Sequence, residues 1–100
     1  MLDIKIDRNG STLDAALEGM LDTKTAPQLS EAIITPISEL DEINLDFAKL
    51  EYLTSAGLRV ILEAQQEMDD KDGKLTIKNV NEEIMEVFEM TGFVDVLTII

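Results

Sequence analysis

The sequence has no cysteine and no histidine. Without cysteine the chain has no disulfide framework and no thiolate chemistry. Without histidine it lacks the commonest general base and metal ligand. Its five glycines are scattered, so no glycine-rich loop is present to cradle a phosphate. We therefore expect a protein that is not an enzyme, with no catalytic residue and no cofactor.

A metal site is not expected either. The acidic turn that contains Asp70, Asp72 and Gly73 superficially resembles part of a calcium loop. A calcium loop needs an oxygen ligand at its first position and Glu at its last. Met68 and Asn79 occupy those two places. The simpler interpretation is a solvated turn that ends a helix.

Basic residues are scarce: 8 Lys and Arg stand against 21 Asp and Glu, which gives a net charge of −13. This balance disfavours nucleic acid and anionic membrane surfaces as partners, and it favours basic proteins. It also favours a monomer when the protein is free. No apolar run reaches the ~18 residues that span a bilayer, so we expect no membrane insertion. The first residues lack the basic and apolar regions of a signal peptide, so we expect a cytoplasmic protein.

One hundred residues, of which 45% are hydrophobic, predict a single domain over residues 1–100. Apolar residues alternate with polar ones at 2–6 and again at 13–17, and Asn9-Gly10 between them is a strong hairpin signal. We expect Gly19–Lys24 to form a loop. Thr25 and Gln28 have the spacing of a capping box before a helix whose apolar positions run to Leu40, and Pro36 should kink or end that helix.

The second half of the chain alternates strands and helices. Ile43, Leu45 and Phe47 predict a third strand, with Ala48–Leu53 as a short connection to a helix that starts at Thr54-Ser55 and stops at Asp72-Gly73. The remaining elements are a strand around Leu75 and Ile77, a helix capped by Asn81 and Gly92, and a last strand over Val96–Ile100. We interpret Met68, Met85 and Met90 as core residues.

The order β-β-α-β-α-β-α-β predicts an α/β fold. We expect a mixed, mostly parallel sheet of about five strands, with an antiparallel N-terminal hairpin and three main helices. In open sheets of this kind, partners and ligands meet the loops at the carboxyl ends of the strands. Those loops contain Asp22 and Thr25, then Glu51 to Ser55, then Asn79 and Asn81, and they could form a single surface.

Ser55 is the most informative residue at this edge, because it opens a helix directly after a loop. Its hydroxyl could serve as a plain helix cap. Phosphorylation there would add nearly two negative charges, which the helix N-terminus would accept. Residue type and position alone leave both interpretations open.

Three stretches resemble the STAS-domain anti-sigma factor antagonist family. Tyr52-Leu53-Thr54-Ser55-Ala56-Gly57-Leu58-Arg59-Val60 is similar to its phosphorylation-site signature. Gly19 to Ala26 is similar to its Gly-x-Leu-Asp-x-x-Thr-Ala segment, and Phe88 to Phe93 to its Phe-x-x-(Ser/Thr)-Gly-Leu segment. The three stretches occur in the family's order, and the resemblance covers nearly the whole chain as one STAS domain.

The resemblance implies a function by partner switching. In such antagonists the unphosphorylated protein binds an anti-sigma factor that is also a serine kinase, and the sigma factor is released. Phosphorylation at the position of Ser55 abolishes binding, and a PP2C-type phosphatase restores it. The implied partner-binding surface comprises Asp22, Thr25, Thr54, Ser55, Ala56, Gly57 and Arg59.

Two residues depart from the family pattern. Thr54 replaces the common Asp before the phosphoserine, and Ala56 stands where Ser or Thr is usual. The first departure leaves open an alternative, a structural STAS subunit that is never phosphorylated and belongs to a transporter-associated or signalling complex. A sensor of a nucleotide or another small molecule is a second alternative, which the absence of a phosphate-binding loop disfavours.

Overall fold

The computed structural model describes all residues 1–100 and contains one five-stranded sheet. The strands are β1 (Leu2–Asn9), β2 (Thr12–Leu21), β3 (Glu42–Leu53), β4 (Lys74–Lys78) and β5 (Thr98–Ile99), and they lie in sequence order across the sheet. The pair β1–β2 is antiparallel and the other three pairs are parallel. The predicted fold class, with its N-terminal hairpin and mostly parallel sheet, is confirmed.

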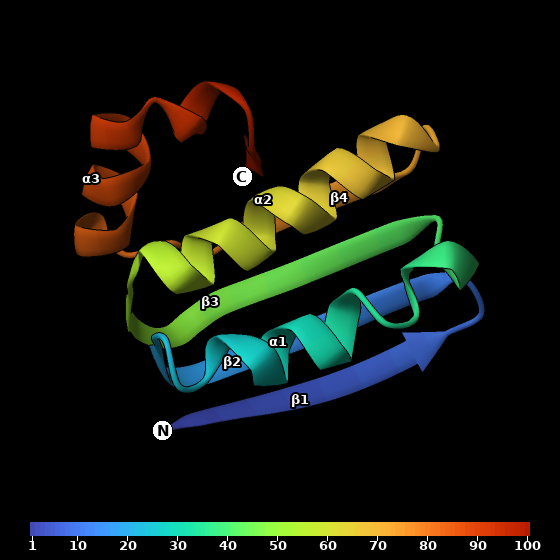
Figure 1. Cartoon of the computed structure of the whole chain (residues 1–100), viewed down its shortest axis with the longest axis horizontal. Coiled ribbons are helices and arrows are strands. Elements are labelled where there is room, and N and C mark those ends of the chain that lie inside the picture. The colour runs from blue at the N-terminus through green and yellow to red at the C-terminus, as the bar shows by residue number, and fades with distance from the viewer.

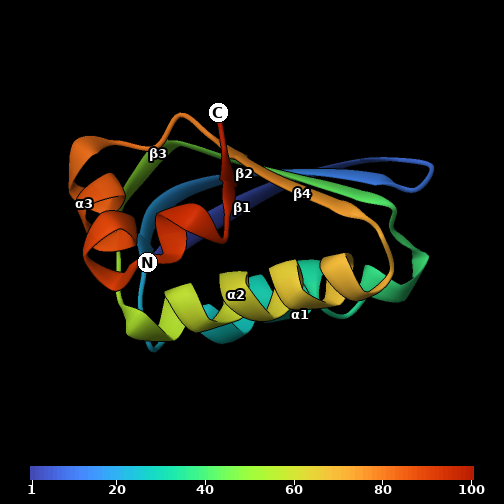
Figure 2. The ribbon, with the colours of Figure 1, turned by 90° about the horizontal axis from the view of Figure 1, so that it is seen from above.

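The helices α1 (Ala26–Ile33), α2 (Ser55–Asp70) and α3 (Glu82–Thr91) lie on one side of the sheet (Figure 2). Two short 3-10 helices, η1 (Ile37–Glu39) and η2 (Phe93–Asp95), complete the chain. Each parallel crossover carries its helix over the same face, so apolar residues on that face form one core. The core joins strand residues such as Leu45 and Ile77 to helix residues such as Ile61 and Phe88. Polar residues of the strands occupy the opposite, open face.

Both long strands extend further than the sequence predicts. Gly19–Leu21 belong to β2 instead of a loop, and Ala48–Leu53 belong to β3 instead of a connection. The register between β2 and β3 shifts twice near these ends, and each shift places an additional residue in β3. The bulges break the period-two alternation, so Leu50 and Leu53 are both buried at a spacing of three. A search for strict alternation therefore ends too early.

The first helix is shorter than predicted, and its capping box is wrong. The Thr25 side chain makes no capping hydrogen bond, and Gln28 Nε2 donates to Leu2 O at 2.8 Å. The helix ends at Ile33, in agreement with the prediction that Pro36 kinks or ends it. The apolar spacing continues beyond the helix because Ile37 and Leu40 are buried around η1.

The remaining predicted elements are confirmed with one change at the end. Asn81 caps α3 by accepting a hydrogen bond from Ile84 N at 2.8 Å, and Gly92 ends it with a φ of +81°. The last strand is reduced to Thr98–Ile99, because η2 occupies the chain just before it and leaves Val96 outside the sheet. Met68 is buried as predicted, whereas Met90 is 86% exposed, so its assignment to the core is wrong.

Candidate functional site

The carboxyl ends of β2 and β3 and the start of α3 meet at one edge of the molecule (Figure 1). Thr54 N donates to Leu21 O at 2.9 Å, which joins the ends of β2 and β3. Asn81 Nδ2 donates to Leu50 O at 3.0 Å and to Glu51 O at 3.3 Å, which joins the start of α3 to the end of β3. The prediction that three loops share one surface is confirmed for the first two loops and for Asn81. It is wrong for Asn79, whose Nδ2 donates to Asp46 Oδ1 at 2.9 Å in the middle of β3, because β4 ends well before β3 does. We refer to this region as the carboxyl edge.

The loop after β2 is held by hydrogen bonds between Asp22 and Thr25. Asp22 Oδ1 accepts from Lys24 N at 2.9 Å, from Thr25 N at 3.0 Å and from Thr25 Oγ1 at 3.2 Å. Thr25 Oγ1 also accepts from Asp22 N, and its one hydroxyl hydrogen is shared between Asp22 Oδ1 and Met20 O, which lies 3.0 Å away. The hydrogen bond from the Thr25 amide is the main cause that lowers the pKa of Asp22 below its usual 3.8, because it stabilises the carboxylate form.

The start of α2 packs directly onto the end of β2. At Gly57 a Cβ atom would collide with Leu21 Cγ, and it would lie 2.8 Å from Leu21 Cδ2 and 3.2 Å from Leu21 O. Only a residue without a side chain allows this approach. Gly57 is itself buried, so it shapes the carboxyl edge from within.

Ser55 is the first residue of α2, and it is exposed. The preceding Thr54 has the extended backbone of a helix cap, but its side chain makes no capping hydrogen bond. Its Oγ1 is buried without any hydrogen-bond partner. The first turn of α2 contains no acidic residue. The amide groups at the start of α2 therefore have no anionic or side-chain partner, and their positive potential is directed at the surface around Ser55.

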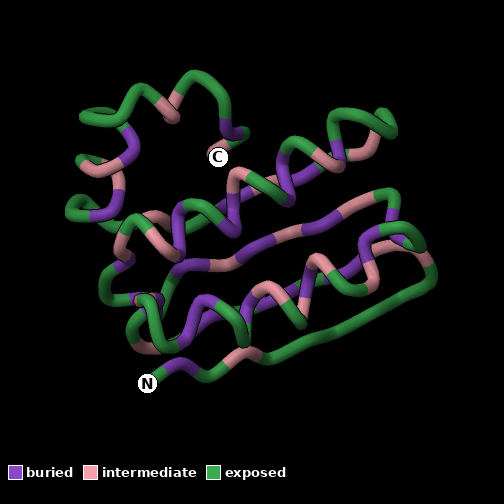
Figure 3. The backbone as a smooth tube through the Cα atoms, in the orientation of Figure 1, coloured by how far each residue is buried: buried purple, intermediate pink, exposed green.

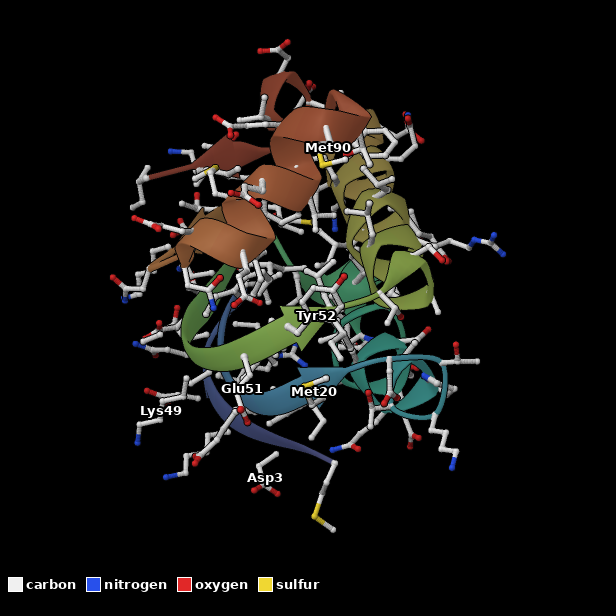
Figure 4. All side chains as sticks on the ribbon, turned by 90° about the vertical axis from the view of Figure 1, so that its left-hand side faces the viewer. Asp3, Met20, Lys49, Glu51, Tyr52 and Met90 are labelled. Atoms are coloured by element: carbon white, nitrogen blue, oxygen red, sulfur yellow. The ribbon has the colours of Figure 1, made fainter.

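The first charged residue of α2 after Ser55 is the cation Arg59. Arg59 follows Ser55 by four residues on α2, so the two lie on the same face of the helix, and both are exposed. Glu51 lies on the opposite side of the β3 end from Tyr52 and points away from α2 (Figure 4).

Exposed apolar side chains at the carboxyl edge were missed by the sequence analysis. Met20 and Tyr52 are paired in the β2–β3 register and are both exposed, and Met90 projects from α3 on the same edge (Figure 4). Exposed apolar groups beside polar ones are typical of protein-binding surfaces. The bulges that place Met20 opposite Tyr52 leave no periodic signal in the sequence. We refer to the paired Met20 and Tyr52 as the Met-Tyr cluster.

The seven predicted partner-binding residues are all on the elements that form the carboxyl edge, at different depths. Ser55 and Arg59 are exposed, whereas Thr25 and Gly57 are buried. Asp22, Thr54 and Ala56 are intermediate. Contact with a partner stays a prediction for all seven, and the two buried residues would act by positioning the others.

Comparison with known proteins identifies the family. The STAS domain model matches residues 3–100. The chain belongs to the STAS-domain family.

Several proteins that carry the name of anti-sigma factor antagonist are similar to this STAS domain over nearly its full length. BtrV of Bordetella bronchiseptica is 27% identical over 98% of this chain and 85% of its own. The anti-sigma-B factor antagonist of Listeria monocytogenes is 26% identical over 98% of this chain and 86% of its own.

Among solved structures, the anti-sigma factor antagonist SpoIIAA in its unphosphorylated form is 20% identical. It superposes with a TM-score of 0.80 over 98% of this chain and 87% of its own. At this identity the likeness concerns the fold. None of the helices in the STAS domain has both the length and the apolar character needed to cross a membrane.

Proposed function

We propose that this STAS domain is a cytoplasmic, non-enzymatic anti-sigma factor antagonist that is switched by phosphorylation of Ser55. Its partner would be an anti-sigma factor with serine kinase activity, and a PP2C-type phosphatase would reverse the modification. The observation that carries the proposal is Ser55 itself, exposed at the uncapped start of α2 in the middle of the carboxyl edge. Full-length similarity to named antagonists supports the same function.

A phosphate on Ser55 would act at the interface without unfolding α2. The free amide groups at the helix start and the cation of Arg59 would accept the phosphate locally. A partner docked over Ser55 excludes water, and burial of a dianion that the partner does not pair is very costly. Each 1.4 kcal/mol lost is about a tenfold loss of affinity, so one phosphoryl group is sufficient to release the partner.

A binding experiment with matched variants tests the proposal. Immobilised wild type and Ser55→Ala should retain the kinase from an extract of the native cells, and the retained protein should phosphorylate wild type at Ser55 when ATP is added. Ser55→Asp should retain little of it. Ser38→Asp is the control, because it adds the same charge at an exposed position in η1, far from the carboxyl edge. Equal retention by Ser55→Asp and Ser38→Asp would rule out a charge switch at Ser55.

Thr54 favours a second candidate function. The family's usual carboxylate at this position is replaced by a hydroxyl that is buried and has no hydrogen-bond partner. If phosphorylation requires that carboxylate, the protein is a constitutive STAS subunit of a larger complex. A lack of phosphate on Ser55 in protein purified from its native cells, together with co-purification of membrane components, would favour this candidate.

A further inference from the structure

The strand β1 forms a free edge of the sheet. It runs for eight residues along one side, and no other segment lies beyond it (Figure 1). Most of its residues are exposed (Figure 3). A free edge strand presents unpaired N–H and C=O groups that can pair with another strand.

Only part of this edge is available for pairing. Hydrogen-bonded pairs alternate along an antiparallel ladder, and Met20 N donates to Met1 O at 3.0 Å. Odd-numbered residues of β1 therefore direct their N–H and C=O groups toward β2, and even-numbered residues direct theirs outward. At Leu2 the outward carbonyl is already occupied, because Gln28 Nε2 donates to it at 2.8 Å. The outward groups of Ile4, Ile6 and Arg8 remain free.

The charges of β1 are complementary to those of a second copy in one alignment. If two β1 strands pair antiparallel around Ile6, each Lys5 lies opposite Asp7 of the other copy, and each Ile4 lies opposite Arg8. The pairs that form hydrogen bonds are then those between the free residues Ile4, Ile6 and Arg8. The two Ile6 side chains, each 45% exposed in the single chain, lie against one another.

The two alignments shifted toward the N-terminus of β1 are less favourable. Pairing around Lys5 places Lys5 opposite Lys5 and Asp3 opposite Asp7, and like charges directly opposite are destabilising. Pairing around Ile4 requires the Leu2 carbonyl that Gln28 occupies.

The Arg8 side chain is held away from the edge, because its Nη2 donates to Glu39 Oε1 at 2.8 Å. It therefore does not block the alignment around Ile6.

We propose that this STAS domain self-associates through β1, in antiparallel pairing around Ile6, into a symmetric dimer with a continuous ten-stranded sheet. Helices lie on one face of each sheet, and the symmetry axis at Ile6 keeps both sets on the same side. The two carboxyl edges then point to opposite ends of the dimer, so both copies of Ser55 stay accessible. The net charge by itself favours a monomer. In the dimer, the pairs between Lys5 of one copy and Asp7 of the other offset this general repulsion.

The experiment compares three charge variants by sedimentation over a concentration series that reaches roughly the millimolar range, where small interfaces associate. Asp7→Lys places two lysines opposite each other and should weaken the dimer at least tenfold. Asp3→Lys makes the same change in net charge, but in this alignment residue 3 lies opposite Asn9, so its dimer should be unweakened. Lys5→Asp combined with Asp7→Lys exchanges the two charges and should restore association to within a few-fold of wild type.

Two readouts keep the outcome decisive. Amide hydrogen exchange at Ile4, Ile6 and Arg8 should slow as the protein concentration rises, and thermal unfolding establishes that each variant is folded. A wild type that remains monomeric throughout, or a folded double variant that fails to recover, would overturn the proposal. So would an Asp7→Lys dimer as strong as the Asp3→Lys dimer, which would mean that net charge alone controls association. Because Ser55 plays no part in this pairing, the result is independent of the proposed switch.

Discussion

At the scale of single residues, Gly57 determines how closely α2 approaches the end of β2. Replacement by Ala would force the new methyl group into Leu21, and overpacking of this kind costs about 1–3 kcal/mol of unfolding free energy. Urea denaturation of Gly57→Ala should show this loss. Leu21→Ala removes the side-chain atoms involved, so the double variant should lose less than the sum of the two single variants. Strict additivity would mean that Leu21 is not the obstacle.

The contribution of Asp22 to the stability of the fold depends on pH. Its pKa is lowered in the folded protein, first by the Thr25 amide, so the ionised carboxylate stabilises the fold above its unfolded pKa of 3.8. That contribution is lost as the pH falls through the lower, folded pKa. Asp22→Asn should therefore be less stable than wild type at neutral pH, and the difference should shrink below pH 3.8. Thermal unfolding across pH checks this, and a difference that stays constant with pH would contradict it.

At the scale of elements, Asn81 connects α3 to the end of β3. It caps α3 through Ile84 N and donates to two carbonyl groups of β3. Asn81→Ala removes all three hydrogen bonds and should cost about 1–3 kcal/mol. Chemical denaturation measures this against Gln66→Ala, which removes only an exposed hydrogen bond to Asp70 and should stay within about 0.5 kcal/mol of wild type. Equal effects would mean that Asn81 does not hold the two elements together.

The elements also show what the sequence could predict. Alternation identified the hairpin and the first part of β3, and residue type identified Asn81 and Gly92 at the ends of α3, because these signals are local. The second half of β3 could not be predicted, because its bulges exist only through pairing with β2. The apparent capping box failed for a similar reason: Gln28 is recruited by the distant Leu2 carbonyl.

The same distinction applies to the carboxyl edge. The order of strands and helices was sufficient to bring Asp22, Ser55 and Asn81 to one surface. The Met-Tyr cluster and the lone hydroxyl of Thr54 depend on burial and register, which only the folded chain determines. Residue patterns thus predict where the site is, and the structure adds which of its atoms are exposed.

At the scale of the whole molecule, a sheet covered on one face holds Ser55 at one end and the free β1 edge along one side (Figure 1). Partner binding and self-association would thus use different surfaces. The protein already has a net charge of −13, so one added phosphate changes that net charge little. Its effect on binding comes from its position at the carboxyl edge.

The central claim is that Ser55 is the switch, and intact mass with site mapping tests it most directly. Wild type and Ser55→Ala are incubated with ATP and an extract of the native cells, beside a known antagonist and its own kinase as a positive control. We predict that wild type gains one phosphoryl group, mapped to Ser55, and that Ser55→Ala gains none. An unmodified wild type while the control is phosphorylated, or a phosphoryl group that persists in Ser55→Ala, would contradict the account.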